Sequence, residues 1–381
     1  MLDVTDAEAL ETRRLVVETA RAFAQEKLAP RAAERERERR IEPDIIRELG
    51  ELGFLGATIS PEWGGAGLDS LTYAMALEEI AAGDASVSTL VSVHNSPTCT
   101  ILERYGTEAQ KERFLRPMAS GQWVSCFALT EPQAGSDASN LRTRAVRDGD
   151  DWIIDGTKQF ISNGSIAKIC LLFAVTDPAA GKKGISCFAV PTDTPGYTVA
   201  RVEHKLGQHA SDTCALVFES MRVPAENLIG GEGEGYRIAL STLESGRIGI
   251  GAQAVGIARA ALDYAIAYAK ERIAFGRPII DNQAVAFRLV EAKTKLEAAR
   301  QLVHLAARKK DAGENALEAA CMAKLYASEV AEEICSAAIQ TLGGYGYLAD
   351  YPVERAYRDV RICQIYEGTS DIQKLILARS L

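Results

Sequence analysis

The sequence has no long apolar run and no excess of basic residues. Its longest apolar stretches, such as 169–175 and 185–190, are far shorter than the roughly 20 residues of a membrane-spanning helix. The 43 basic and 52 acidic residues give a net charge of −9, whereas proteins that bind nucleic acids rely on Lys and Arg to neutralise phosphates. We therefore expect neither membrane insertion nor a nucleic-acid partner.

Cysteine and histidine are present but never clustered. The eight cysteines form no CxxC pair, and none of the four histidines has a metal-ligand spacing. This distribution predicts reduced, mostly buried thiols, no disulfides and no metal site. The first ten residues have neither the basic start nor the apolar run of a secretory signal, which favours a cytoplasmic protein.

Common catalytic motifs are missing as well. The sequence has no GxxxxGK[ST] and no GxSxG, and its glycines at 231–235 and 343–346 do not form GxGxxG after a strand. The usual nucleotide-binding and hydrolase signatures are therefore absent. Four dispersed histidines also argue against a histidine-based catalytic triad.

The composition that is present is that of a globular protein, with 47% apolar and 25% charged residues. At about 150 residues per domain, this length predicts two or three domains. The first third is rich in helix formers and places Leu15, Thr19, Ala22 and Phe23 at helical spacing. A further helix is predicted over 70–82, and the alternating charges of 31–40 indicate a solvated helix end.

The middle and C-terminal parts have different patterns. Between 123 and 224, short β-type runs separated by turn residues predict a small barrel or sandwich. From Gly235 onward the helical period returns, with one apolar stripe from Val255 to Ala269 and another from Val330 to Thr341. Long elements with small residues on their stripes predict an antiparallel four-helix bundle.

The predicted fold class is therefore α+β, in three consecutive domains. We expect an N-terminal helical domain over 1–122, a middle β domain over 123–230 and a C-terminal helical bundle over 231–381. No internal repeat and no low-complexity tract interrupts this order.

A first candidate site is the segment 127–137, FALTEPQAGSD, at the entry of the β region. The hydroxyls of Thr130 and Ser136, Gly135 and nearby N–H groups can donate hydrogen bonds to a planar heterocycle or a phosphate. The same residue types also form ordinary turns, so the spacing alone leaves both interpretations open.

A second candidate site is the segment 156–163, GTKQFISN, which ends a predicted strand. Phe160 and Ser162 are two residues apart, so on a strand they share one face, where one can stack and the other donate a hydrogen bond. Without other support, this pattern is more typical of a hairpin edge.

A third candidate site lies in the C-terminal region 340–371. Its glycines at 343, 344 and 346 follow a predicted helix and allow close approach of a ligand or another backbone. Glu367, between Tyr366 and Gly368 on a predicted loop, is a candidate general base if bulky neighbours exclude water. A helix-capping or surface glutamate would show the same pattern.

In this order, and in an α–β–α chain of this length, the three segments resemble the acyl-CoA dehydrogenase family over nearly the whole chain. Residues 127–140 are similar to the first family signature, and 340–359 fit the second. Glu367 in Tyr-Glu-Gly-Thr-Ser matches the catalytic base of the short- and medium-chain branches. Gly246 supports this match, because branches with the base on that helix have Glu there.

The resemblance implies an FAD-dependent enzyme that converts a saturated acyl-CoA to the trans-2-enoyl-CoA and passes electrons to an electron-transferring flavoprotein. Glu367 is implied to remove the α-proton while a hydride leaves for flavin N5, and Arg247 is implied to lie under the catalytic loop. The implied FAD contacts are Phe127, Leu129, Thr130, Gly135, Ser136, Phe160, Ile161, Ser162, Arg272, Phe275, Gln283, Gln340, Gly344, Thr369 and Asp371. The implied substrate contacts are Ser136, Glu244, Arg247, Tyr366 and Gly368.

The resemblance also implies an oligomer, in this family usually a tetramer. The FAD contacts at Arg272, Phe275, Gln283, Gln340 and Gly344 are implied to come from a neighbouring subunit. Several positions depart from the commoner family residue, but none of them removes the base or the flavin-facing hydroxyls. These positions are Gln133, Asn140, Glu244, Ala274 and Asp371.

Other functions stay open at this point. A decarboxylating, glutaryl-CoA-type enzyme needs a basic residue at the far end of the acyl pocket, where residues 90–97 offer His94 but no Arg or Lys. A nitroalkane-oxidase-like relative would carry Asp at 367, and a flavin-free acyl-CoA-binding scaffold would be colourless. Acyl chain length is also open: 91–96 resembles short-chain members, which we favour, and 207–213 resembles medium-chain ones.

Overall fold

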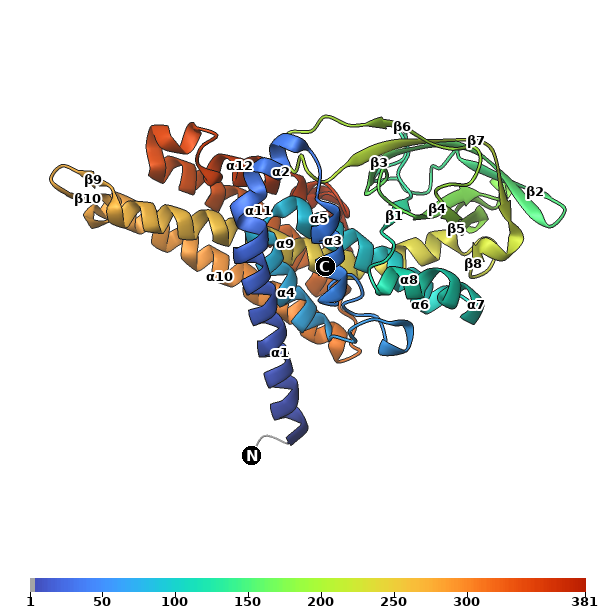
Figure 1. Cartoon of the computed structure of the whole chain (residues 1–381), viewed down its shortest axis with the longest axis horizontal. Helices are drawn as coiled ribbons and strands as arrows, with labels where there is room; N and C mark the ends of the chain where they lie inside the picture. Colours follow the sequence, from blue (N-terminus) through green and yellow to red (C-terminus); the bar gives the residue numbers. More distant parts are fainter. Residues whose placement is uncertain (1–3) are drawn as a thin grey trace.

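The computed structural model describes residues 4–381, in which a β region at one end adjoins long helices that extend to the other end (Figure 1). Residues 1–3, part of the segment behind the compartment prediction, lie outside the described residues. The N-terminal helices are α1 (Val4–Phe23), α2 (Ala32–Glu38), α3 (Pro43–Glu51), α4 (Ser70–Gly83), α5 (Ala85–Val93), α6 (Thr100–Tyr105), α7 (Glu108–Gln110) and α8 (Arg116–Ala119). Within residues 4–381, no helix is both long and apolar enough to cross a membrane.

The middle region is a mixed sheet of eight strands. They are β1 (Ser125–Ala128), β2 (Arg144–Asp148), β3 (Asp151–Ser162), β4 (Ile169–Val175), β5 (Ile185–Pro191), β6 (Tyr197–Val202), β7 (Thr213–Pro224) and β8 (Leu228–Ile229). The order is β6-β7-β3-β2-β4-β5-β8, and β1 pairs in parallel with β4. A single residue pair, Arg144 with Val175, joins β2 to β4.

The apolar run of β4 is explained by two cores, one on each face of the strand. Ile169, Leu171 and Phe173 pack with the N-terminal helices and the start of α9 (Gly235–Glu271). The alternate residues Cys170 and Leu172 pack inside the β region. Because side chains alternate along a strand, a strand buried on both faces must be apolar throughout.

The C-terminal region is helical, as predicted. Its long helices are α9, α10 (Gln283–Asp311) and α11 (Leu317–Leu342), and the shorter α12 (Pro352–Val360) and α13 (Ser370–Leu377) follow. A two-stranded hairpin of β9 (Ile273–Ala274) and β10 (Arg277–Pro278) connects α9 to α10. The predicted stripe is confirmed on α9, where Val255, Leu262 and Ala269 are buried.

The N-terminal helices and the C-terminal bundle share one hydrophobic core. Helix α4 lies against α9, and Gly256 allows this contact, because a Cβ there would lie 2.2 Å from the Glu78 carbonyl oxygen. Two nearly buried carboxylates of α4 reinforce the contact. Glu78 pairs with Arg300 at 3.0 Å, and Glu79 pairs with Arg259 at 2.7 Å.

The predicted helices of the N-terminal region are confirmed, and the structure decides which of their residues are buried. On α1 the core face carries Val17, Ala20 and Phe23, whereas Leu15 is 50% exposed. The charge run 31–40 is not entirely solvated, because Arg35 is 1% exposed and its Nε lies 2.8 Å from Asp84 Oδ2. The sign alternation of the run does not reveal which of its arginines faces a buried carboxylate.

Candidate active site

The C-terminal candidate loop follows a 3₁₀ turn, Arg361–Gln364, and leads into α13. Glu367 has φ 55° and Gly368 has φ 88°, so two consecutive residues adopt left-handed backbone. Thr369 caps α13, since its Oγ1 accepts the N–H of Ile372 at 3.3 Å. A left-handed glutamate costs roughly 1–2 kcal/mol, so the surrounding structure must hold this turn in place.

The Glu367 carboxyl group lies directly over Gly246 of α9. A Cβ at position 246 would lie 2.5 Å from Glu367 Oε2, closer than real side chains pack. Oε2 itself is buried and has no hydrogen-bond partner among the described residues. Glycine at 246 therefore makes room for a carboxylate that is shielded from water and has an oxygen free to accept a proton.

The electrostatic surroundings of Glu367 are those of a strengthened base. Burial raises the pKa of Glu367 to about 7, against the opposing charges of Arg247 and Lys324, which lower it. Arg247, from α9, is nearly fully buried and its Nε has no hydrogen-bond partner within the described chain. The carboxylate form is therefore available at neutral pH and poorly solvated, which increases its basicity.

Tyr366, which the family resemblance implies to be a substrate contact, has its hydroxyl group in a buried polar network. The hydroxyl donates to Gln253 Oε1 on α9. Gln253 Nε2 donates to Ser88 Oγ and Thr89 Oγ1 on α5, both at 2.7 Å, and Thr89 Oγ1 donates to Gln208 Oε1 at 2.5 Å. Only the ring of Tyr366 is therefore left to face a ligand.

The first two candidate segments, 127–137 and 156–163, lie side by side. The Gln159 N–H donates to the Thr130 carbonyl oxygen at 2.9 Å. Lys158 Nζ, fully buried, donates to Leu129 O at 3.0 Å and to Glu131 Oε1 at 2.8 Å. A buried ion pair thus joins the segments, although we assigned no role to Lys158 or Glu131 from the sequence. An ion pair between two motifs leaves no periodic signal in either.

The predicted FAD contacts of these segments differ in accessibility. Phe160 is 64% exposed with φ 60°, and Gly135 and Ser136 are exposed. Phe127, Thr130 and Ser162 are half-buried. The side chains of Leu129 and Ile161 belong to the hydrophobic cores, so only their backbone is available to a ligand.

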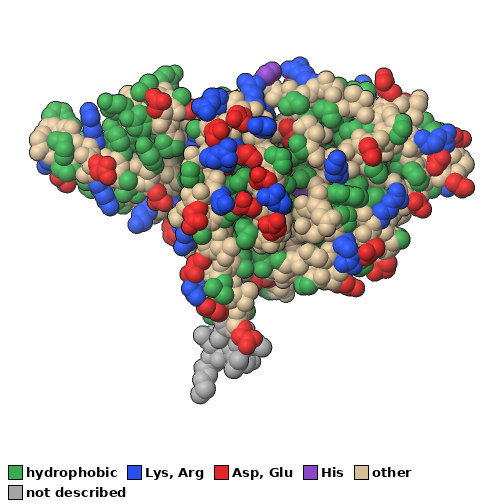
Figure 2. Space-filling view, viewed as in Figure 1, with side chains coloured by type: hydrophobic (Ala, Val, Ile, Leu, Met, Phe, Trp, Pro, Cys, Tyr) green, Lys and Arg blue, Asp and Glu red, His purple; other side chains and the backbone are tan. Residues whose placement is uncertain are grey.

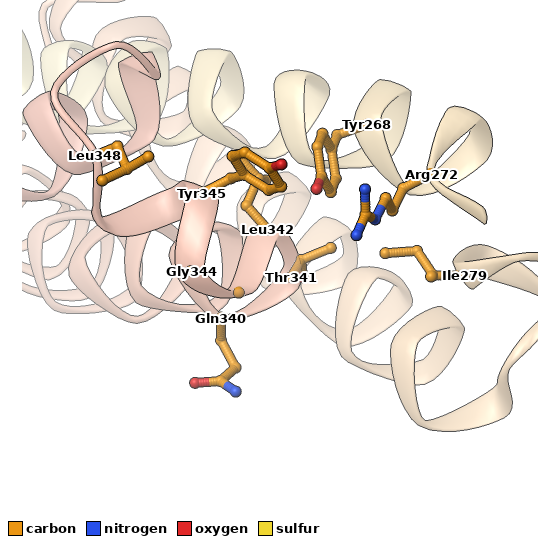
Figure 3. Close-up of a pocket in the computed structure, with 10 residues that line it drawn as sticks. Tyr268, Arg272, Ile279, Gln340, Thr341, Leu342, Gly344, Tyr345 and Leu348 are labelled. Carbon is orange, nitrogen blue, oxygen red and sulfur yellow. The ribbon is translucent and has the colours of Figure 1, made fainter. Parts of the chain in front are cut away.

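A second group of predicted contacts lies where α11 ends beside the end of α9 (Figure 3). A cavity of about 450 Å³ there is lined by Arg272, Gln340 and Gly344, together with Tyr268 and Tyr345. The Arg272 guanidinium carbon lies 5.6 Å from the centre of the Tyr345 ring. Phe275, in the hairpin, is 97% exposed, and Gln283, at the start of α10, is exposed.

These two groups are far apart in one chain. Gly246, under Glu367, and Glu271, next to Arg272, are separated on α9 by about 38 Å at 1.5 Å per residue. The β9–β10 hairpin and the β region lie at opposite ends of the molecule (Figure 1). Thr369 and Asp371, at the start of α13, remain on the same segment as Glu367. Both groups can therefore serve one ligand only if they come from two chains.

Comparison with known proteins identifies matching families along the chain. Family models match the N-terminal domain of acyl-CoA dehydrogenases over residues 10–122, the middle domain over 126–221 and the C-terminal domain over 233–381. The short-chain specific acyl-CoA dehydrogenase of Bos taurus, a mitochondrial protein, is 46% identical over 371 residues. That alignment covers 97% of this chain and 90% of the relative.

Comparison with solved structures agrees with these family matches. Butyryl-CoA dehydrogenase from Megasphaera elsdenii superposes with a TM-score of 0.95 at 43% identity, covering 97% of both chains. A chain in a structure described as the electron transferring flavoprotein of Acidaminococcus fermentans superposes with a TM-score of 0.95 at 44% identity, also covering 97% of both chains. The chain belongs to the acyl-CoA dehydrogenase family.

Proposed function

We propose that this chain oxidises a short-chain acyl-CoA thioester to its trans-2-enoyl-CoA, with Glu367 as the base that removes the α-proton. The observation that carries this proposal is the Glu367 carboxyl group, buried over Gly246 with Oε2 unpartnered among the described residues. The names of the relatives, short-chain specific and butyryl-CoA dehydrogenase, support the substrate class.

Proton removal from a thioester needs more than a carboxylate, because the α-C–H is a very weak acid in water. Burial strengthens Glu367 as a base by raising its pKa to about 7. No acceptor within residues 4–381 takes the backbone N–H of Glu367. This N–H is therefore free to donate to the thioester oxygen, where one such donor typically contributes about 3 kcal/mol to transition-state stabilisation.

The residues present fit FAD. At one end, the exposed Phe160 ring and the half-buried Thr130 and Ser162 hydroxyls offer stacking and hydrogen bonds to a flavin ring. At the other, Arg272 offers a cation for a pyrophosphate, and a Cβ added at Gly344 would meet no atom within 4 Å, which leaves space for close approach. When bound, FAD supplies the acceptor for the hydride that leaves the β-carbon.

An oligomer follows from the separation of these two groups. We propose a tetramer in which each cofactor is held by Thr130, Phe160 and Ser162 of one subunit and Arg272 and Gln340 of a neighbour. The A. fermentans structure supports an electron-transferring flavoprotein as the partner that reoxidises the enzyme. The cytoplasmic location stays a prediction from the sequence.

The side chains of the segment expected to line the acyl pocket argue against a glutaryl-CoA substrate. His94, in the segment we expect to line the acyl pocket, is fully buried and burial lowers its pKa to about 4. Its Nε2 donates to Met118 O at 3.0 Å, while Nδ1 accepts the N–H of Ser125 at 3.1 Å. A neutral, fully engaged histidine cannot bind the distal carboxylate of glutaryl-CoA.

The first test replaces Glu367 with glutamine and adds acyl-CoA under anaerobic conditions. We expect flavin bleaching to slow by about 100- to 10,000-fold, because that is the usual contribution of a general base. In the wild type, kcat/KM should rise with pH through about 7, since only the ionised carboxylate accepts a proton. Butyryl-, octanoyl- and glutaryl-CoA, compared by bleaching rate, should rank in that order.

Two results would contradict the proposal. Bleaching of Glu367→Gln at the wild-type rate would remove Glu367 from the mechanism. A colourless protein that binds acyl-CoA and takes up no added FAD would instead indicate a binding scaffold on the same fold.

A further inference from the structure

Lys324 is a fully buried cation on α11, a helix on which the small residues Ala320, Ala323 and Ala327 around it are also buried. No carboxylate among the described side chains forms an ion pair with it. Its Nζ instead donates to the carbonyl oxygen of Gly368 at 2.7 Å. Because burying a charge without a paired anion is costly, a lysine at this apolar position calls for a reason beyond packing.

Gln373 contacts the same turn. This residue of α13 is fully buried, and its Nε2 donates to Gly368 O at 2.8 Å and to Glu367 O at 3.3 Å. Lys324 and Gln373 therefore hold two consecutive carbonyl groups, those of Glu367 and Gly368. These bonds fix the orientation of the peptide units that follow Glu367, where the backbone is left-handed.

The charge of Lys324 also acts on the Glu367 carboxyl group and lowers its pKa. Two cations act on this carboxyl group, Arg247 from α9 and Lys324 from α11. The other titratable neighbours of Lys324 are the thiols of Cys321 and Cys363, whose pKa values are raised by burial, so both are uncharged at neutral pH. Burial lowers the pKa of Lys324 to about 8, which leaves it mostly protonated at pH 7.

We propose that Lys324 and Gln373 are positioning residues for the base: together they hold the left-handed turn that places the Glu367 carboxyl group over Gly246, and the charge of Lys324 stabilises the carboxylate form. This inference rests on the proposed role of Glu367. It separates two contributions, a backbone contact made by both residues and a charge supplied by Lys324 alone. Different substitutions can remove the two contributions one at a time.

The experiment compares Lys324→Met, Lys324→Gln and Gln373→Leu in the holoenzyme, with Lys309→Met as the control. Lys309 is a more exposed lysine of α10 that pairs with Glu314 at 3.0 Å, so its loss removes a positive charge from an ion pair at the surface. The readouts are kcat, KM, the pH profile of kcat/KM, and the enzyme-catalysed exchange of the acyl-CoA α-proton with D2O. Flavin content and the thermal unfolding midpoint show whether each variant is folded.

We expect Lys324→Met to lower kcat and α-proton exchange about tenfold or more and to raise the apparent pKa in kcat/KM by about one unit or more. Lys324→Gln keeps a donor without the charge, so it should regain part of kcat and keep the raised pKa. Gln373→Leu should lower kcat without moving the pKa. Lys309→Met should match the wild type.

Two outcomes would overturn the inference. One is a Lys324→Met enzyme whose kcat and pH profile stay within about twofold of the wild type. The other is a Lys324→Gln enzyme whose apparent pKa in kcat/KM is the same as in the wild type, because this lysine would then have a purely structural role. If Lys324→Met does not fold, Lys324→Gln and Gln373→Leu provide the test. Glu367→Gln, measured in parallel, keeps the two hypotheses apart: its full activity would refute the role of Glu367 itself.

Discussion

At the scale of single residues, the site depends on one position that has no side chain. Gly246 lies under the carboxyl group of Glu367, which approaches so closely that any Cβ would overlap it. In a helix interior, glycine costs about 1 kcal/mol relative to alanine. At this position the helix therefore gives up stability to leave room for the base, a common trade at functional sites.

Gly246→Ala separates the two effects. We expect the variant to unfold at the same temperature as the wild type or higher, because alanine favours the helix, while kcat falls about tenfold or more as Glu367 is displaced. Differential scanning calorimetry and steady-state kinetics measure the two quantities. Full activity in a folded Gly246→Ala enzyme would show that catalysis does not require the Glu367 carboxyl group to lie over position 246.

At the scale of elements, the buried pair Lys158–Glu131 connects β3 to the loop after β1. Glu131 also accepts the backbone N–H groups of Arg142 and Thr143, at 2.6 and 3.0 Å. One carboxylate thus organises the loop, the strand and the segment that enters β2. Burial raises the pKa of Glu131, but the charge of Lys158 and these hydrogen bonds outweigh burial, and the resulting pKa is lowered.

Lys158→Met should therefore destabilise the protein by about 3–5 kcal/mol, because it leaves Glu131 buried without its cation. It should also weaken FAD retention, since the two segments lose their link. Urea unfolding and flavin content after gel filtration give the measurements. Lys168→Met, the same change at an exposed lysine of the β region, is the matched control and should behave as the wild type. Equal stability of the two variants would contradict the role assigned to the pair.

At the scale of the whole molecule, the end of the long helices exposes several large apolar side chains. Figure 2 shows hydrophobic side chains gathered at the end where the β9–β10 hairpin lies. Phe275 and Tyr347 are almost fully exposed there, and Ile273, Tyr345 and Leu348 are about half exposed. Together with the divided cofactor contacts, this surface indicates that the active protein contains more than one chain.

A complementation experiment tests this arrangement. Arg272→Glu and Glu367→Gln should each be inactive alone, because each damages every site of its own oligomer. When the two chains are co-expressed in equal amounts, a mixed pair contains one site with both native residues, so about a quarter of wild-type activity should return. No recovery in mixed oligomers, isolated with two different affinity tags, would place both residues in the site of a single chain.

Much of this architecture was predictable because it follows from local patterns. The bounds of β4 agree with the apolar run 169–175, β5 extends one residue beyond the run 185–190, and α4 extends one residue beyond the predicted helix. β1 and β2 were missed because short strands with mixed composition have no clear alternation of their own. The buried face of α1 could not be chosen from the sequence, because several faces of this helix carry apolar residues and only contact with α4 selects one.

For the candidate site, the sequence indicated the site residues but not the buried side chains that hold them in position. Lys324 is a lone cation among alanines on an apolar helix face, a signal that was present in the sequence and that we did not use. Gln373 and Glu131 left no such signal, because their partners are backbone groups brought near only by folding. Buried polar contacts of this kind depend on three-dimensional proximity and not on spacing.

The sequence by itself determined the order of helical and β regions, the family resemblance and the identity of the proposed base, since periodicity and motif residues are local properties of the chain. Only the tertiary structure decided how deeply Glu367 is buried and which charges surround it. Burial over Gly246, the cations Arg247 and Lys324, and the separation of the two cofactor-contact groups all arise from packing between distant segments. A carboxylate's basicity depends on the water and charges around it, and those are set when the chain folds.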